Sequence, residues 1–277
     1  MDISIIIVSW NVKDKLRENL LALQSSIFPE KKMEIFVVDN ASADGSAAMV
    51  AAEFPQIRLI ANQENLGFSK ANNQAIELAT GRFILLLNPD MRVYPDTLDK
   101  ALAWAENNPQ ATISGCHLVD ENGFDIKQVR RFPRFFDQLA VVLKLPHIFP
   151  GITSSYLLPN FDYSQAASVD SIRGAFFLIN TVSWKKISSK KPFLDERYFI
   201  WFEEVDFCRQ VYQLGGEVWY SPAANCLDYV GASFKQIKRR RGQDYFSDSM
   251  LKYFAKWEKA WQVRCLAIAW RFIKIFV

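Results

Sequence analysis

The chain of 277 residues has few of the side chains that build disulfide frameworks or histidine-based metal centres. Only two histidines occur, His117 and His147. The four cysteines are far apart, without paired spacing: Cys116, Cys208, Cys226 and Cys265. This pattern excludes a disulfide scaffold and a zinc-finger type of site, and it is typical of proteins from a reducing compartment.

Long apolar runs, phosphate-binding glycine loops and a large charge excess are also missing. No segment approaches the roughly 18 uncharged apolar residues of a membrane-spanning helix. The chain starts directly with a strand pattern, so we expect no signal segment and a cytoplasmic location. No Gly-x-Gly-x-x-Gly or Walker lysine loop occurs, which argues against a dinucleotide fingerprint or a P-loop. The net charge of +3 gives no general reason to expect nucleic-acid binding.

The sequence does contain an alternation of apolar strands and amphipathic helices. Strand patterns cover Ile3–Val8, Ile35–Val38, Ile57–Ile60 and Phe83–Leu87. Helical patterns fill the intervals, at about 13–26, 46–54 and 69–79. Such alternation predicts right-handed βαβ units. We therefore predict an α/β fold with an open, mostly parallel Rossmann-like sheet flanked by helices, and a C-terminal helical extension.

The stretch Phe83–Asp90 gives a strong local signal. Five apolar residues without alternation indicate a strand that is buried on both faces. Pro89 ends this strand because proline cannot donate to a sheet ladder. Asp90 then lies at the carboxyl edge of a central strand, where open α/β sheets bind ligands. A solvated turn is the alternative, since Asn-Pro-Asp is common turn chemistry.

Polar residues end the other early strands as well. Ser9 and Asn11 follow the first strand, and Asp39 follows the second. The ends of parallel strands lie along one edge, which favours a ligand pocket over three unrelated turns. Asp39 is the candidate acceptor of hydrogen bonds from a base or ribose. The alternative is that Asp39 caps the helix near Asp44.

Three carboxylates within four positions, Glu203, Glu204 and Asp206, follow an aromatic run. Like charges this close raise each other's pKa, which suits a general base. The alternative is ordinary N-terminal capping, because a helix dipole favours acids in the first turn. Gly174, at the start of another apolar strand, would let a ligand approach the backbone closely.

Two further segments are less regular. Gln128–Ser168 is rich in proline and aromatic residues, and we interpret it as a partly ordered excursion over the pocket. After the basic run Lys235–Arg241, the segment Tyr245–Val277 has tryptophans among cations and no acid after Glu258. That composition predicts an interfacial membrane helix. A C-terminal helix packed on the domain is the alternative.

Six stretches, in this order, resemble family 2 glycosyltransferases of the GT-A fold, in particular the rhamnosyltransferase-like bacterial branch. The resemblance covers about residues 3–233. The matching stretches are Ile5–Asn11, Val37–Ser46, Asn65–Asn73, Leu86–Asp90, Gly174–Ile179 and Phe202–Asp206.

The resemblance implies roles on the donor side. Ser9, Asn11 and Asp39 would hold the base and ribose of a nucleotide-sugar. Further residues would line the nucleotide-sugar site: Asn65, Gly67, Phe68, Asn72, Asn88 and Gly174.

The resemblance also implies metal and catalytic roles. Asp90 is the last residue of the family's Asp-x-Asp element and would bind Mg²⁺ or Mn²⁺. Asn88 takes the first position of that element and is a neutral, weaker ligand. Glu204 falls where the catalytic base lies, although the family usually has an aspartate there. Asp228 stands in place of a histidine that can join the metal site, and its carboxylate would replace the charge lost at Asn88.

The function that the resemblance implies is inverting transfer of a sugar, with rhamnose favoured, from a nucleotide-diphosphate donor. The acceptor would be a hydroxyl of a glycan or lipid-linked glycan in bacterial cell-surface polysaccharide synthesis. The alternatives are a sugar nucleotidyltransferase and a degenerate, non-catalytic nucleotide-sugar-binding subunit.

We expect two parts of the chain. Residues 1–234 would form the GT-A domain, with a nucleotide-sugar half at about 1–118 and an acceptor and catalytic half at about 119–234. Residues 235–277 would form a basic amphipathic helical region, with 245–277 in peripheral contact with the inner face of the membrane.

Overall fold

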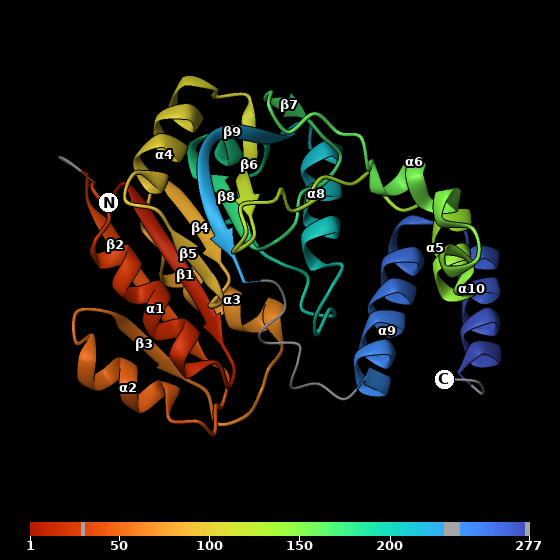
Figure 1. The fold of residues 1–277 in the computed structure, drawn as a ribbon, viewed down its shortest axis with the longest axis horizontal. Coiled ribbons are helices and arrows are strands. Elements are labelled where there is room, and N and C mark those ends of the chain that lie inside the picture. Colours follow the sequence, from red (N-terminus) through yellow and green to blue (C-terminus); the bar gives the residue numbers. More distant parts are fainter. Residues whose placement is uncertain (29–30, 230–238, 275–277) are drawn as a thin grey trace.

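A nine-stranded sheet with helices on both faces forms the body of the protein in the computed structural model, which describes residues 1–28, 31–229 and 239–274 (Figure 1). The strand order is β3-β2-β1-β4-β8-β6-β9-β5, and β7 pairs with β9. The strands are β1 (Ile3–Ser9), β2 (Met33–Asp39), β3 (Arg58–Ala61), β4 (Phe83–Leu87), β5 (Met91–Val93), β6 (Ala111–Val119), β7 (Ala167–Ser168), β8 (Phe176–Asn180) and β9 (Glu217–Asp228).

The helices follow the strands in the alternation that the sequence predicts. In chain order they are α1 (Lys13–Gln24), α2 (Ser46–Glu53), α3 (Phe68–Leu78), α4 (Thr97–Asn107), α5 (Phe135–Val142), α6 (Ser154–Leu157), α7 (Thr181–Ile187), α8 (Glu203–Gln213), α9 (Arg239–Trp257) and α10 (Ala260–Ile273). Two short 3-10 turns, η1 (Leu145–His147) and η2 (Pro150–Thr153), lie between α5 and α6.

The predicted α/β class with a mostly parallel sheet is confirmed. Among the described strands, β3, β2, β1, β4, β6 and β9 run in one direction, whereas β8, β5 and β7 run against it. Alternate residues of β1 face opposite layers, with Ile5 and Ile7 packed in the core that contains α1, and Ile6 in the core that contains α3. The central strands are therefore buried on both faces, as the unbroken apolar runs indicated.

The second half of the sheet contains a longer strand than its sequence indicates. Residues 218–220 and 226–227 by themselves predict two short strands. In the structure both are parts of one strand, β9, which pairs with β6 on both sides of an irregularity in register. The sequence between them contains Pro222 and small residues, which made it resemble a turn. The three-residue strand β5 and helix α7 were not anticipated, because each is too short to show a clear period.

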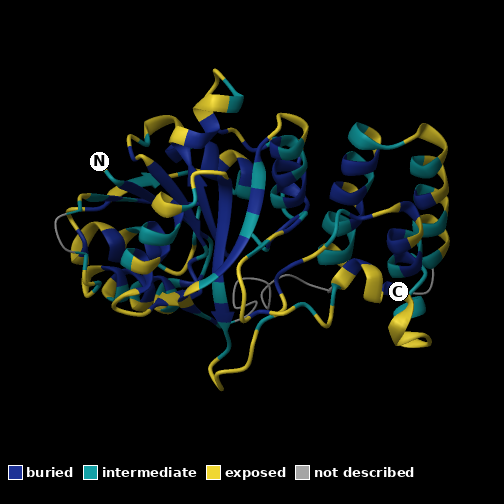
Figure 2. Cartoon of the chain, turned by 90° about the horizontal axis from the view of Figure 1, so that it is seen from above, coloured by how far each residue is buried: buried dark blue, intermediate teal, exposed yellow. Residues whose placement is uncertain are grey.

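The C-terminal region packs on the domain, and it consists of two helices where the sequence suggested one. Helices α9 and α10 lie together with α5 on the side of α8 that faces away from the sheet (Figure 1). They share a separate core to which α9 contributes the buried residues Met250, Tyr253 and Phe254. Figure 2 shows buried stretches, in dark blue, in the helices near the C-terminus, apart from those of the sheet. The break at Glu258 coincides with an ion pair between Glu258 and Arg209 of α8, at 2.9 Å.

Several expectations concern residues that the structure does not describe. The expected boundary between residues 234 and 235 lies outside the described residues, as do most of the basic run Lys235–Arg241 and the last three residues of the expected C-terminal helix. The segment Gln128–Ser168 forms α5, η1, η2, α6 and β7. Helix α5 packs against α10, whereas η1, η2 and α6 pack with α5 or with one another. None of the described helices combines the length and apolar character that a membrane crossing requires.

Candidate active site

Ser9 and Asp39 meet at the carboxyl edge of the sheet, because β1 and β2 are paired in parallel with these two residues in register. Asp39 Oδ2 accepts the amide of Ser42 at 3.0 Å. Among the described residues, Asp39 Oδ1 and Ser9 Oγ have no hydrogen-bond partner although both are buried. Asp44, not Asp39, accepts the amide of Ser46 at the start of α2. Asp39 thus keeps a buried acceptor atom at the edge where a nucleotide is expected.

Asn11, in the loop after β1, contacts the loop after β2 at the same edge of the sheet. Its backbone adopts a positive φ of 53°. Its side-chain Oδ1 accepts the amide of Ala43 at 2.7 Å, and its own amide donates to Ser42 Oγ at 2.9 Å. The loops after β1 and β2 are therefore bound to one another.

The loop before α3 is held against the segment that leads to α8. Asn65 Oδ1 accepts the amide of Gly67 at 2.9 Å, and the amide of Phe68 donates to the carbonyl of Phe199 at 2.7 Å. Gly67 has φ of +83°, and a Cβ there would lie 2.6 Å from the Phe199 carbonyl oxygen. Glycine is required for this contact between segments. Asn72 is buried and donates to the Phe68 carbonyl, so it stabilises the first turn of α3.

Asp90 and Asp228 lie beside each other across paired strands. Met91 is the register partner of Asp228, and the amide of Tyr229 donates to the Asp90 carbonyl at 3.1 Å. Both carboxylate side chains are buried. The amide of Asn88 donates to the carbonyl of Ala175 at 3.0 Å, which brings the start of β8 to the same place.

Glu204 lies against Gly174, close to the same edge of the sheet. A Cβ built on Gly174 would lie 3.4 Å from Glu204 Cβ and 3.7 Å from its Cγ, so the absent side chain makes room for Glu204. The residue before Gly174 is Arg173, whose Nη1 lies 3.0 Å from Asp228 Oδ2. A continuous series of contacts therefore connects Asp90, Asp228, Arg173 and Glu204, although they are far apart in sequence.

Burial raises the pKa of both glutamates at the start of α8. The pKa of Glu203 is raised well above its ordinary value by burial and then by the adjacent Glu204 carboxylate. The pKa of Glu204 is also raised by burial, while Arg130 and Arg173 oppose the shift. A carboxylate with a raised pKa is a stronger base, which suits proton abstraction from a hydroxyl.

Three residues near Glu204 were missed by sequence reasoning: Arg130, Tyr156 and Arg173. Burial raises the pKa of Tyr156, with the Glu204 carboxylate adding to the shift and Arg130 opposing it. Tyr156 is on α6, in the segment 128–168, and its phenol therefore lies near Glu204. Arg173 interrupts an otherwise apolar and neutral strand start, which is the one sequence signal that could have drawn attention to it.

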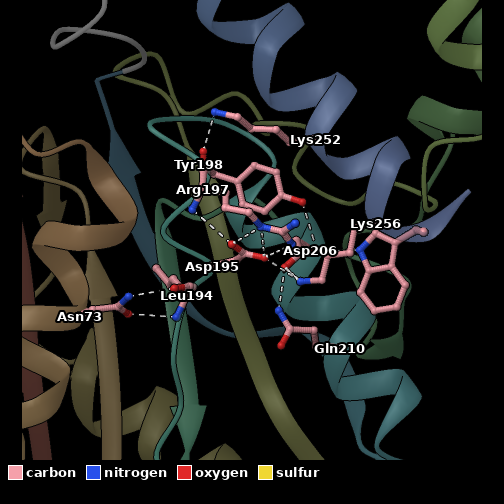
Figure 3. Close-up of polar contacts among 10 residues, drawn as sticks. Asn73, Leu194, Asp195, Arg197, Tyr198, Asp206, Gln210, Lys252 and Lys256 are labelled. Atoms are coloured by element: carbon pink, nitrogen blue, oxygen red, sulfur yellow. Dashed lines mark hydrogen bonds and ion pairs between the residues drawn. The ribbon is translucent and has the colours of Figure 1, made fainter. Parts of the chain in front are cut away.

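Asp206, the third of the three acids at the start of α8, contacts the C-terminal helices rather than Gly174. The carboxylate of Asp206 is fully buried and lies 2.7 Å from Lys256 Nζ of α9 (Figure 3). It also accepts from Gln210 Nε2 at 2.6 Å and Trp257 Nε1 at 2.6 Å. The acidic cluster therefore divides, with Glu204 beside Gly174 and Asp206 bound to the C-terminal helices.

Comparison with known proteins identifies the family to which these motifs belong. The family model described as "Glycosyl transferase family 2" matches residues 4–163, more than half of the chain. The chain belongs to glycosyl transferase family 2. The matched region contains the donor-side residues Ser9, Asn11, Asp39 and Asp90.

Curated relatives of this family 2 chain include two rhamnosyltransferases. An N-acetylglucosaminyl-diphospho-decaprenol L-rhamnosyltransferase of Mycobacterium tuberculosis is 24% identical over 242 residues, which cover 83% of this chain and 76% of that protein. The rhamnosyltransferase WbbL of Escherichia coli is 26% identical over 172 residues, which cover 59% of this chain and 61% of that protein.

Solved structures support the GT-A fold of this family 2 chain. The mannosyltransferase PcManGT of Pyrobaculum calidifontis, in complex with GDP-Man and Mn²⁺, superposes with a TM-score of 0.60 at 18% identity, covering 96% of this chain and 73% of that one. Staphylococcus aureus TarS 1–349 with UDP-GlcNAc gives a TM-score of 0.55 at 17% identity, covering 92% and 66%.

Family 2 membership raises the question of a divalent metal ion. The described residues contain no group of three or more His, Cys, Asp or Glu placed to hold a metal. Mg²⁺ often needs only one or two protein carboxylates, because phosphate oxygens and waters supply the rest. The buried carboxylate of Asp90, next to Asn88, fits that requirement in its donor chemistry. The Asp228 carboxylate is already paired with Arg173, so it fits a metal ligand less well than Asp90 does.

Proposed function

We propose that this family 2 chain is an inverting glycosyltransferase that moves a sugar from a nucleotide-diphosphate donor to a hydroxyl of a lipid-linked glycan. The observation that supports the proposal is the series of contacts that links Asp90 to Glu204 by way of Asp228, Arg173 and Gly174. Rhamnose is the sugar we favour, and a lipid-linked acceptor is supported by the name of the M. tuberculosis relative.

On the donor side, the base and ribose bind at the ends of β1 and β2. Ser9 Oγ and Asp39 Oδ1 are buried polar atoms there without a partner among the described residues, so a ligand would satisfy them. Asn11 orders the surrounding loops through its contacts with Ser42 and Ala43. Gly67 and Phe68 connect this half of the site to Phe199, five residues before Glu204.

On the acceptor side, Glu204 is the base. Its carboxylate takes the proton of the acceptor hydroxyl as that oxygen bonds to the anomeric carbon, and the bond from this carbon to the donor diphosphate breaks. Attack from the face opposite the leaving group inverts the anomeric centre. When bound, Mg²⁺ or Mn²⁺ supplies charge neutralisation on the leaving diphosphate, and Asp90 is the residue that would hold it.

The experiment that tests the proposed function is a thermal-shift panel of nucleotide-sugars with Mg²⁺ or Mn²⁺, followed by turnover of the best donor. Stabilisation by dTDP-rhamnose or another nucleotide-sugar, together with slow metal-dependent donor hydrolysis, would support the glycosyltransferase. Pyrophosphate release from a nucleoside triphosphate would indicate a nucleotidyltransferase instead. Donor binding without hydrolysis or transfer would indicate a non-catalytic subunit.

We also propose that the outer face of α10 contacts an anionic membrane surface. Trp261, Ile268 and Phe272 are 50%, 66% and 59% exposed and follow one another at helical spacing. The exposed Arg264 and Arg271 lie on the same helix, and the sequence has no acid after Glu258. Exposed aromatic and apolar side chains beside cations are typical of interfacial helices.

Flotation with vesicles containing anionic lipid tests this contact. Deleting residues 245–277 would remove the buried core residues Met250, Tyr253 and Phe254, so a surface variant is the better probe. The double change Ile268→Ser and Phe272→Ser should abolish flotation, and it spares Trp261, whose ring contacts the buried Phe135 at a centroid distance of 4.9 Å. Failure of the intact chain to float would refute the membrane contact and leave the transferase proposal intact.

A further inference from the structure

We infer that Arg173 binds the diphosphate of the donor and that Asp228 orients the guanidinium for this purpose. The inference deepens the proposed function and rests on it. It concerns the ion pair between Arg173 and Asp228, which connects the strand beside Asp90 to the segment that contacts Glu204.

The first argument is the asymmetry of the ion pair. Arg173 Nη1 lies 3.0 Å from Asp228 Oδ2; the carboxylate side chain is 2% exposed, whereas the arginine side chain is 28% exposed. A guanidinium has five N–H donors in a planar fork, and an ion pair through one nitrogen uses only part of them. The buried carboxylate thus anchors the arginine from the protein side, and the remaining part of the side chain reaches solvent.

The second argument is the position of the arginine. Gly174 follows it and contacts Glu204, and the carbonyl of Ala175 accepts the amide of Asn88. Arg173 also opposes the rise in the pKa of Glu204, so its charge acts on the carboxylate assigned as the base. Its backbone therefore lies between the end of β4, where Asp90 lies, and the start of α8.

The third argument is charge balance. The carboxylates at this edge are Asp39, Asp90, Glu204 and Asp228. A donor diphosphate brings further negative charge to the same edge, and its charge grows as the bond to the sugar breaks. Arginine pairs with phosphate oxygens through two parallel hydrogen bonds, which supplies both charge and orientation. A fixed cation there stabilises the leaving group without reorganisation.

Arg130 is a second arginine whose charge acts on Glu204. It pairs with Ser171 in an isolated antiparallel bridge, two residues before Arg173. Arg130 opposes the pKa shifts of both Glu204 and Tyr156, which places its charge with the phenol of α6. It therefore belongs to the acceptor side of Glu204, whereas Arg173 is bound to the Asp90 side through Asp228.

This assignment gives Asp228 a different role from the metal ligand implied by the family resemblance. A carboxylate that anchors a guanidinium orients a cation supplied by the chain itself. The two roles are separable by experiment, because a metal ligand affects binding only when metal is present, whereas an arginine anchor affects binding in EDTA as well.

The test is calorimetric binding of a nucleoside diphosphate and its matched monophosphate, in EDTA and in Mg²⁺. The probe is whichever of dTDP, UDP and GDP the intact wild-type chain binds most tightly. Arg173→Gln should weaken diphosphate binding in EDTA by about 10-fold or more, as expected for loss of a charge-assisted hydrogen bond. Monophosphate binding should change by less than about 3-fold. Arg264→Gln, which changes an exposed arginine of α10, is the control and should leave both affinities nearly unchanged.

Two further variants keep the test independent of folding. Arg173→Gln leaves the buried Asp228 carboxylate without its arginine, so the double variant Arg173→Gln with Asp228→Asn removes both charges at nearly constant shape. It should show the same selective loss of diphosphate affinity. Arg173→Lys should retain part of that affinity, because it keeps the charge and loses the fork.

The outcomes are distinguishable from failure of the proposed function. If the wild type binds none of the three nucleotides, the proposed function fails. If the wild type binds and Arg173→Gln binds the diphosphate equally well in EDTA, the role of Arg173 is refuted. Equal weakening of diphosphate and monophosphate would also refute it, since that pattern indicates a structural effect. If Asp228→Asn removes only the Mg²⁺-dependent part of the affinity, Asp228 is a metal ligand and the orienting role is refuted.

Discussion

The ammonium of Lys256 lies 2.7 Å from the carboxylate of Asp206 and 3.0 Å from that of Asp195 (Figure 3). Asp206 is on α8, two residues after Glu204, whereas Lys256 is at the end of α9. The ion pairs therefore connect the C-terminal helices to the helix that begins with the proposed base. Asn73 of α3 extends the connection, because its side chain exchanges two hydrogen bonds with the backbone of Leu194.

Replacing Lys256 should destabilise the fold. Lys256→Met leaves Asp206, which is fully buried, without its nearest cation. Breaking a buried pair in this way costs about 3–5 kcal/mol. Urea unfolding measures the loss. Lys100→Met is the control, since Lys100 pairs with Asp96 at the surface, where both side chains are exposed, and its loss should cost under about 1 kcal/mol. Equal stability of the two variants would show that the buried pair does not hold α9.

Replacing Glu204 should remove the chemistry and keep the binding. Glu204→Gln keeps the shape next to Gly174 but cannot accept the proton, so turnover should fall by about 10²–10⁴-fold. The calorimetric affinity for the donor nucleotide should stay within about 2-fold. In the wild type, kcat/KM should rise with pH as Glu204 loses its proton, with a midpoint above the ordinary value because burial raises this pKa. Near-normal turnover of Glu204→Gln would exclude it as the base.

Replacing Asp90 should affect the metal-dependent part of donor binding. Asp90→Ala removes the carboxylate proposed to hold Mg²⁺ or Mn²⁺, so the difference in donor affinity between Mg²⁺ and EDTA should largely disappear. Titration calorimetry in the two buffers measures it. Asp96→Ala, an exposed aspartate paired with Lys100, is the control and should keep the full difference. An unchanged metal effect in Asp90→Ala would contradict the assignment.

Glu203 should make the protein less stable as the pH rises. Burial raises the pKa of Glu203, so the folded state keeps this proton to a higher pH than the unfolded chain does. The stabilisation from the protonated form is complete below the unfolded pKa of about 4.5 and is lost as the pH rises through the folded pKa.

Glu203→Gln should therefore raise the unfolding temperature, and by more at pH 8 than at pH 5. Differential scanning calorimetry at the two pH values measures both gains. A gain that is the same at pH 5 and pH 8 would show that Glu203 does not titrate between them. An absence of any gain at pH 8 would show that its burial costs little.

The early strands and their polar ends could be predicted because their signals are local. An unbroken apolar run such as Phe83–Leu87 indicates a strand buried on both faces, and parallel pairing then brings Ser9, Asp39 and Asp90 to one edge. The motif Phe202–Asp206 likewise pointed to Glu204 as the candidate base, and the structure places Glu204 beside Gly174. These inferences depend on period and on residue type, both of which are visible within a few positions.

What the tertiary structure alone decided is which charges face each other. Asp206 and Glu204 are two residues apart and look equivalent in the sequence, yet one is bound by Lys256 of α9 and the other lies beside Gly174. The pairing of Arg173 with Asp228 spans 55 positions. The energy of an ion depends on its distance from other charges and on its burial, and both are properties of the folded chain rather than of a local sequence window.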